Sequence, residues 1–584
     1  MNTIGFNNFR RFANFPEMDL GDITLLVGGN NSGKSTLVKT LLLCIDNARL
    51  MTAGTKDNVF RSLSPKFRFD ANDWHDVKVK TFSRAIHNRP THSLDLLDDE
   101  LSLPTQMRFI FTLGVFKFVL IVSGDRDKDE VTGNVDYISI EDRGNMVQYT
   151  ISYADRTMSY SVLGSTTERE TLVKRLYKDY VSAKESLESL SEAGDDIAAI
   201  SAQSEKVASL EKQIEEFVNP DGEELPEDFD YEQALKKQFR DFLKTRYTST
   251  SWDMPLEDYG DVIYENLLVH AIGNFIGFAN NPGQAQPTGI EDPNEYGAAM
   301  QAWMYVQDAR QALRQEVDKI RKSKSELASL LNSIGIEYIT AHAANQNTIY
   351  NTADRNDYIA QTVHEFVRAK IAPGQEEFNF VTEWMSKFGI GSNFEIIPID
   401  GEAYRVKIKD EEGYVVNLAD NGMGSIQMMI LLLRLATILR TYEPQHMIIL
   451  SPEDEIRYPV VIIEEPEQNL HPKVQSLLAD LFLYLNKNYH CKFVVETHSE
   501  YLIRKTQVIV ANENYEDEDA LKENNPFMVY YFDGENVKRP YFPMEYELSG
   551  AFKNKFGEGF FDEASKWDMT IIRKEFELKK KNRK

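Results

Sequence analysis

The segment GGNNSGKST, residues 28–36, constrains this chain more than any other part of its sequence. It follows ITLLV at 23–27, a short apolar run that is typical of a buried strand. It leads into STLVKTLLLCI at 35–45, where apolar residues recur at helical spacing. The segment is therefore predicted to form the loop of a strand–loop–helix unit.

The same segment matches the pattern G-x-x-x-x-G-K-[ST], with Gly28 and Gly33 as its glycines. Glycines let backbone N–H groups converge on phosphate oxygens, and the positive end of the following helix adds to the attraction. Lys34 would neutralise the terminal phosphates, and the Ser35 hydroxyl would bind Mg²⁺. The residues expected to bind nucleotide are Gly28, Asn30, Asn31, Ser32, Gly33, Lys34, Ser35 and Thr36.

Two later segments carry polar residues at the ends of predicted buried strands. In PVVIIEEPEQNLHP, 459–472, Glu464 is predicted to hold the magnesium shell. Glu465 is predicted to polarise the attacking water. CKFVVETHSEYLIRK, 491–505, repeats the design, and His498 stands where a sensor of the γ-phosphate is expected.

Composition favours a folded, multi-unit protein of a reducing compartment. The 584 residues exceed a single core, and 42% of them are hydrophobic. Cys44 and Cys491 are too few for a disulfide framework, so a cytoplasmic location is expected. No signal peptide is expected at the N-terminus. The apolar run at 426–439 is shorter than the roughly 20 residues that span a bilayer, so a buried helix and no membrane contact are predicted.

The formal net charge of −27 argues against nucleic acid attraction through the overall field. DNA contact would need a local basic patch, and KKKNRK at 579–584 also fits a solubilising tail.

The chain is predicted to contain an α/β head interrupted by a helical block. Segments 1–165 and 335–510 have strand and αβ character, whereas 166–334 is rich in long helical patterns. An antiparallel helical hairpin around Gly194 is the simplest interpretation of the start of this insertion. Segment 218–260 is acidic and contains proline, so it is predicted to be a linker or loose loop, and 511–584 is predicted to be a C-terminal extension.

Four motifs together resemble the ABC-type ATPases of the SMC/RecF/OLD (overcoming-lysogenisation-defect) group. They are NNFRRF, ITLLVGGNNSGKST, VIIEEPEQNLHP and VVETHSEYLIRK. They are most similar to the stand-alone bacterial ATPases of that group, many of which serve in phage-defence operons. The resemblance covers 1–165 and 335–510 and extends weakly to GEGFFDE in the tail. It implies an ABC-ATPase head, in which a P-loop mixed or parallel sheet joins an antiparallel β subdomain, with a helical or coiled-coil hairpin insertion.

The resemblance also implies ATP and Mg²⁺ as cofactors and a homodimer or higher homo-oligomer that closes over ATP. Its signature motif would be LADNGMGSIQ, 418–427, in which Gly424 and Ser425 face the partner's nucleotide. The motif departs from the LSGGQ form, and a simple helix cap is the alternative interpretation. Gln106 is a candidate for the family's conserved glutamine but also fits the start of a strand. Arg10 and Arg11 fit phosphate, base or surface roles equally.

The function that we expect is an ATP-driven switch that controls a separate effector, a nuclease or toxin encoded in the same operon. No built-in nuclease is expected, because Asp517 and Asp519 lack a preceding apolar strand and fit a solvated loop. A structural role is favoured for His342. The alternatives are a RecF/SMC-like DNA repair or DNA-scanning ATPase and a nucleotide-gated scaffold that barely hydrolyses ATP.

Overall fold

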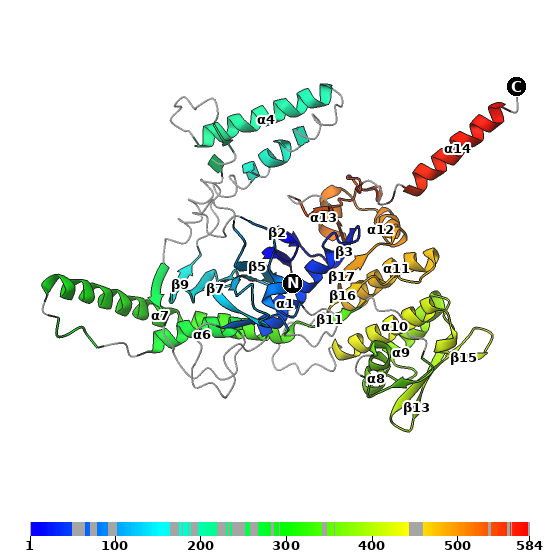
Figure 1. The fold of residues 1–584 in the computed structure, drawn as a ribbon, viewed down its shortest axis with the longest axis horizontal. Coiled ribbons are helices and arrows are strands. Elements are labelled where there is room, and N and C mark those ends of the chain that lie inside the picture. Colours follow the sequence, from blue (N-terminus) through cyan, green and yellow to red (C-terminus); the bar gives the residue numbers. More distant parts are fainter. Residues whose placement is uncertain are drawn as a thin grey trace. The chain divides into compact units, whose positions relative to one another are not determined.

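The computed structural model describes most of the chain, and its residues fall into two compact units (Figure 1). Unit 1 comprises Met1–Tyr137, Asp261–His270 and Lys324–Lys584, and unit 2 comprises Ile138–Gly260 and Ala271–Ser323. The described residues are 2–49, 65–70, 79–91, 102–163, 175–177, 179–184, 186–187, 197–218, 229–231, 234–235, 251–256, 267–281, 285–290, 292–340, 347–354, 357–442, 459–534, 539–557, 561 and 563–581.

A central sheet in unit 1 carries the motifs. Its strand order is β11-β16-β17-β3-β18-β19, and all neighbours are parallel except the last pair. The strands are β3 (Ile23–Gly28), β11 (Ile336–Ile339), β16 (Val460–Glu464), β17 (Lys492–Thr497), β18 (Phe527–Phe532) and β19 (Tyr541–Pro543). Inner strands such as β3 are buried along their length, because helices cover parallel sheets on both faces. The predicted strands before the three motifs are confirmed.

Helices follow the motif strands directly. Helix α1 (Lys34–Arg49) starts in the glycine-rich segment, α11 (Pro472–Tyr489) follows the acidic pair, and α12 (Glu500–Asn512) follows His498. His471 and Ser499 cap the last two helices, since their side chains accept hydrogen bonds from Lys473 N–H and Leu502 N–H. The polar loops before α11 and α12 are therefore each held between a buried strand and a capped helix.

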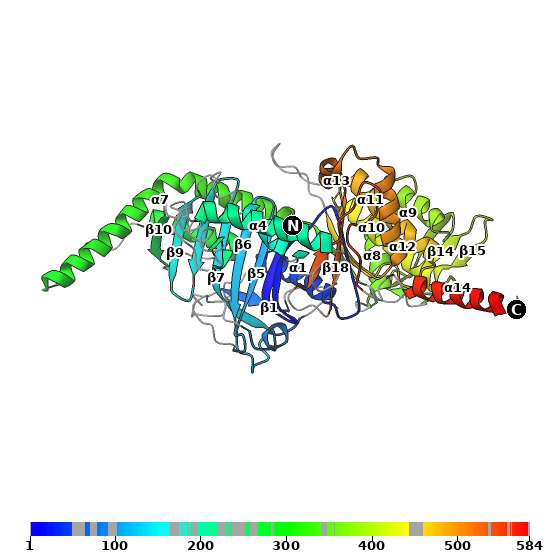
Figure 2. The ribbon, with the colours of Figure 1, turned by 90° about the horizontal axis from the view of Figure 1, so that it is seen from above.

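Helix α10 (Met423–Tyr442) lies in the core of unit 1, as the sequence predicts for 426–439. Among the described residues it alone is long and apolar enough to span a membrane, yet most of that apolar stretch is buried. Figures 1 and 2 group it with α8 (Tyr358–Arg368), α9 (Glu376–Lys387) and a small antiparallel sheet. The strands of that sheet are β12 (Tyr350–Asn351), β13 (Asn393–Ile399), β14 (Ala403–Lys409) and β15 (Val415–Asn417).

A second, antiparallel sheet begins in unit 1 and has an aromatic core. Strand β1 (Thr3–Phe9) pairs with β2 (Phe12–Asp19) and β5 (Gln106–Leu113), and β5 pairs with β6 (Phe116–Ser123). The Phe6 and Phe15 rings stack with their centroids 4.5 Å apart. Strand β4 (Lys66–Arg68) pairs with the start of β7 (Thr132–Asp142), and α2 spans Phe82–Ala85.

Unit 2 combines antiparallel strands with helices. Strand β9 (Thr157–Val162) pairs with β8 (Val147–Ser152) and β10 (Ser251–Pro255). The helices are α4 (Ile197–Val218), most of α6 (Leu267–Asn280) and most of α7 (Pro293–Ser333). Tyr180 in the preceding helical segment donates a hydrogen bond to Glu211 Oε1 at 3.1 Å, so helical segments pack together as the predicted insertion requires.

The bounds of the two units differ from the four predicted segments. Strand β9 of the predicted first half pairs with β8 and with β10, and β10 lies inside the predicted insertion. Strand β18 of the predicted C-terminal extension pairs with β3, so it completes the central sheet. α13 (Glu518–Asn524) and α14 (Glu563–Lys581) also fall in that extension.

Asp517 is exposed, but it caps α13 instead of lying in a plain loop, because its side chain accepts a hydrogen bond from Ala520 N–H. The residues Gly194 and His342, most of the predicted linker 218–260, and parts of GEGFFDE and KKKNRK lie outside the described residues. The linker prediction is wrong at Ser251–Pro255, because these residues form strand β10 by pairing with β9.

The burial of α10 predicts that Leu433→Ala destabilises unit 1. Leu433 is 0% exposed, and truncating it should lower the free energy of unfolding by about 2–5 kcal/mol. The same change at Leu548, which is 43% exposed, should cost no more than about 0.5 kcal/mol. Urea unfolding followed by tryptophan fluorescence measures both, and equal effects would contradict the placement of α10 in the core.

Candidate active site

Two glycines of the loop between β3 and α1 are required by its geometry. Gly28 and Gly33 have φ angles of 148° and 112°, which other residues rarely adopt. A Cβ on Gly28 would lie 2.5 Å from the Phe532 carbonyl oxygen, and one on Gly33 would lie 2.2 Å from Cζ of Phe12. The loop therefore packs tightly against β18 and the start of β2, and only glycine fits at these two positions.

The Lys34 ammonium is buried inside this loop. Its Nζ donates hydrogen bonds to the carbonyl oxygens of Gly28 at 3.0 Å and Gly29 at 3.1 Å. It also lies 3.2 Å from His498 Nε2 and 3.8 Å from Glu496 Oε1. Burial lowers the pKa of Lys34, and the nearby carboxylates oppose that change. The phosphate oxygens of a bound nucleotide would therefore replace some of these partners of the ammonium.

The other predicted loop residues divide into buried and exposed groups. Asn30 and Asn31 are exposed, and Asn31 adopts a φ of 59°. Ser32 and Thr36 are buried, and the Ser32 hydroxyl has no hydrogen-bond partner among the described residues. An unpartnered buried hydroxyl in a loop of this shape fits a contact to phosphate.

The acidic pair lies at the end of β16. Glu464 is the last residue of that strand and is in register with Glu496 of β17. Glu465 follows with a φ of 43°, a left-handed conformation that costs a non-glycine residue on the order of 1–3 kcal/mol. Its backbone N–H donates to the Glu496 carbonyl oxygen at 2.7 Å, and Gln468 Nε2 donates to its Oε2. The strained backbone and these bonds fix the direction of the Glu465 side chain.

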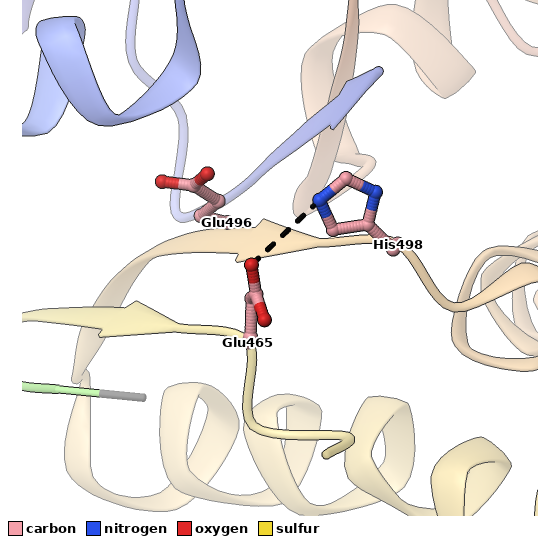
Figure 3. Close-up of side chains that lie close together, drawn as sticks. All are labelled: Glu465, Glu496 and His498. Atoms are coloured by element: carbon pink, nitrogen blue, oxygen red, sulfur yellow. Dashed lines mark ion pairs between the residues drawn. The ribbon is translucent and has the colours of Figure 1, made fainter. Parts of the chain in front are cut away.

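Figure 3 shows Glu465, Glu496 and His498 gathered at the ends of two neighbouring strands. Glu465 Oε1 lies 3.8 Å from His498 Nε2, and ligand atoms of all three residues lie within 4.8 Å of one another. Burial and the Lys34 ammonium lower the pKa of His498, which favours its neutral imidazole. Both distances involve Nε2, so in a neutral ring this nitrogen either accepts a hydrogen bond from the Lys34 ammonium or donates towards Glu465, but cannot do both at once.

Glu496 is a site residue that sequence reasoning missed. The Ser35 hydroxyl donates to both of its carboxylate oxygens, at 3.1 and 3.0 Å. Burial raises the pKa of Glu496 to about 7, while Lys34 opposes the rise. Its signal in the sequence was the acid in VVETHS, which ends an apolar strand as Glu464 does.

The side-chain oxygen atoms at this site are suitable ligands for Mg²⁺. The cation prefers hard oxygen ligands, and the Ser35 hydroxyl and the Glu496 carboxylate already lie together. Glu464 lies opposite Glu496 in the strand register, and Glu465 follows Glu464 in the sequence. In the structure, Ser35 contacts Glu496, whereas the sequence predicted that Ser35 and Glu464 together bind Mg²⁺.

Residues Gly424 and Ser425 of the predicted signature lie in the first turn of α10. The Ser425 backbone N–H donates to the Gly422 carbonyl oxygen at 2.9 Å. A Cβ on Gly424 would lie 2.6 Å from the Asn469 carbonyl oxygen, so the helix start packs against the loop that follows the acidic pair.

The remaining candidates near the site are Gln106, Arg10 and Arg11. Gln106 starts β5 and donates to Asp136 Oδ2 at 2.9 Å. Arg11 Nη2 donates to the Gly534 carbonyl oxygen at 2.9 Å, beside the glycine-rich loop. Burial lowers the pKa of both arginines.

Comparison with known proteins agrees with this geometry. Residues 1–503 match the family model described as "AAA ATPase domain" (AAA_15). The chain belongs to this family. It is therefore an AAA-type ATPase, which is consistent with ATP as the nucleotide of the site. No curated protein matches the sequence significantly.

Among solved structures, SMC head domains are similar to the chain. The head from Pyrococcus furiosus, bound to the C-terminal domain of ScpA, is 11% identical with a TM-score of 0.29, over 93% of this chain and 96% of that chain. The head from Thermotoga maritima is 10% identical with a TM-score of 0.30, over 93% and 98%. These values are too low to add to the argument.

The raised pKa of Glu496 predicts a pH-dependent contribution to stability. A carboxyl whose pKa is higher in the folded protein stabilises it most below the unfolded pKa of about 4.5, and this contribution is lost as the pH rises towards 7. The stability advantage of the nucleotide-free wild type over Glu496→Gln should therefore shrink between pH 4.5 and 7. Thermal unfolding across this range measures it.

The exposed Glu516 provides the control for this measurement. The difference between wild type and Glu516→Gln should stay constant across the same pH range. A constant difference for Glu496→Gln as well would contradict the prediction.

Proposed function

We propose that this protein is an ATP-hydrolysing switch whose hydrolytic centre is formed by Lys34, Glu465 and His498. The observation that carries the proposal is the chain of contacts from Glu465 to His498 at 3.8 Å and from His498 to Lys34 at 3.2 Å. A general base, a neutral imidazole and a phosphate-binding ammonium thus meet beside one loop.

Each residue has a defined task in this proposal. The Lys34 ammonium leaves the loop carbonyls and binds the terminal phosphates of ATP. Glu465, directed by its strained backbone and by Gln468, orients the attacking water and takes its proton. His498 donates a hydrogen bond from an imidazole N–H to the terminal phosphate and reports its presence. Mg²⁺, held by Ser35 with Glu464 and Glu496, would neutralise the developing phosphate charge.

ATP-dependent association of two copies completes the proposed switch. Gly424 and Ser425 start α10, and the positive end of a helix binds phosphate. They pack beside Asn469 of the loop that carries Glu465, so a partner's nucleotide bound at the α10 start would be near the hydrolytic loop. A homodimer with two composite sites, or a higher homo-oligomer, follows from this arrangement.

We further propose that the switch acts in the cytoplasm on a companion effector, a nuclease or toxin from the same operon, in anti-phage defence. The long helices α4 and α7 lie wholly or mostly in unit 2, whereas the residues of the proposed hydrolytic centre belong to unit 1. The net charge of −27 favours a protein target over DNA.

Glu465→Gln should separate ATP binding from hydrolysis. Loss of the general base should lower kcat by about 10²-fold or more and leave ATP affinity within about threefold. The variant should therefore accumulate as an ATP-bound oligomer, measured by light scattering with and without ATP and Mg²⁺. Glu516→Gln is the matched control, and a Glu465→Gln variant with wild-type turnover would refute the hydrolytic role.

The companion is tested by expression of the native operon. A neighbouring protein should copurify with this chain and be retained or released when ATP is added to the wild type. A companion-free oligomer whose ATPase is stimulated by DNA, with a steep dependence on salt, would instead support the DNA-clamp alternative.

A further inference from the structure

Glu467 is a buried carboxylate that the proposed chemistry does not use. It lies in the loop between β16 and α11 and is 7% exposed. Its Oε1 accepts a hydrogen bond from the His498 backbone N–H at 2.6 Å. Its Oε2 is buried and has no hydrogen-bond partner among the described residues.

Stability alone does not explain a glutamate at this position. Burial raises the pKa of Glu467, and the hydrogen bonds from the His498 backbone and the Thr497 side chain only oppose that rise. A buried carboxylate with one unpartnered oxygen carries a desolvation cost. Its bond from the His498 N–H is short, as expected when a carboxylate accepts from an N–H group. The role of Glu467 should therefore be sought in the segment that its hydrogen bond positions, which is the backbone at His498.

The neighbours of His498 are fixed by other bonds. Thr497 ends the buried strand β17, and its hydroxyl accepts from the Ser499 N–H at 3.0 Å. Ser499 caps α12 and donates to Gln475 Oε1 at 2.6 Å. The peptide N–H of His498 itself is held by Glu467. The acceptor on Glu467 thus determines how far the His498 backbone stands from the loop that carries Glu465.

That distance matters because the His498 ring has two partners to reach. Its Nε2 lies 3.2 Å from Lys34 Nζ and 3.8 Å from Glu465 Oε1. The backbone of Glu465 is itself bonded to that of Glu496, two residues before His498. Glu467 makes a second hydrogen bond between the same two segments. Two hydrogen bonds fix the orientation of one segment relative to the other, whereas a single bond would leave the segments free to rotate.

We propose that Glu467 is a positioning residue that holds His498 in reach of Glu465 and Lys34 through the hydrogen bond to the His498 backbone. The kinetic consequence of this inference rests on the proposed hydrolytic function, whereas the hydrogen bond itself can be tested without ATP turnover. The required property is a hydrogen-bond acceptor at this point, which glutamine retains and methionine, of similar length and volume, lacks.

The kinetic test compares Glu467→Met, Glu467→Gln and the control Glu516→Met. Glu467→Met should lower kcat by about tenfold or more, because small displacements of positioning groups slow hydrolysis strongly. Its KM for ATP should change by less than about threefold, since the phosphate-binding loop is untouched. Glu467→Gln should restore kcat to within about threefold of wild type. Equal losses in both Glu467 variants, or none in Glu467→Met, would overturn the proposal.

Amide hydrogen exchange separates this inference from the proposed function. Peptides that cover 497–499 should exchange faster in Glu467→Met than in Glu467→Gln and wild type, with the rest of the central sheet unchanged. This result would support the positioning role even for a wild type that does not hydrolyse ATP, in which case only the proposed function fails. Unchanged exchange at 497–499, or faster exchange throughout unit 1, would refute the positioning role.

Discussion

The burial of one ammonium group is the constraint on which the site depends. Lys34 is 3% exposed, and a buried charge is tolerated only when polar or oppositely charged groups surround it. Two loop carbonyls, the Glu496 carboxylate and the His498 ring meet this need. The phosphates of a nucleotide would compete with these groups for the ammonium, so the interactions that stabilise the nucleotide-free loop are the ones that binding must exchange.

The parallel sheet makes this arrangement possible. Strands β16, β17 and β3 are adjacent and run in one direction, so their carboxyl ends meet at one edge. Glu465, His498 and the glycine-rich loop follow these three strands, and segments about 460 residues apart come within hydrogen-bond distance. Strand β18 closes the other side, where the Phe532 carbonyl leaves room only for a glycine at position 28.

A buried loop network gives the residues of the proposed hydrolytic centre their orientation. Glu465 is held in a left-handed conformation, and Glu467 from the same turn reaches the backbone of His498. Such strain persists only where surrounding bonds over-determine it. The first turn of α10 packs against this loop at Asn469, so the segment predicted to act on a second nucleotide shares a boundary with the hydrolytic centre.

The sequence by itself determined the local units: the strand, glycine loop and helix around Lys34, the acidic pair after β16, and the buried helix α10. Each follows from short-range periodicity and residue chemistry, which do not depend on distant parts of the chain. Only the tertiary structure decided that Ser35 meets Glu496, because that contact requires β17 to lie next to β3. It likewise placed β18 in the central sheet and joined β8 and β9 to β10, since strand order is set by long-range packing that no single segment encodes.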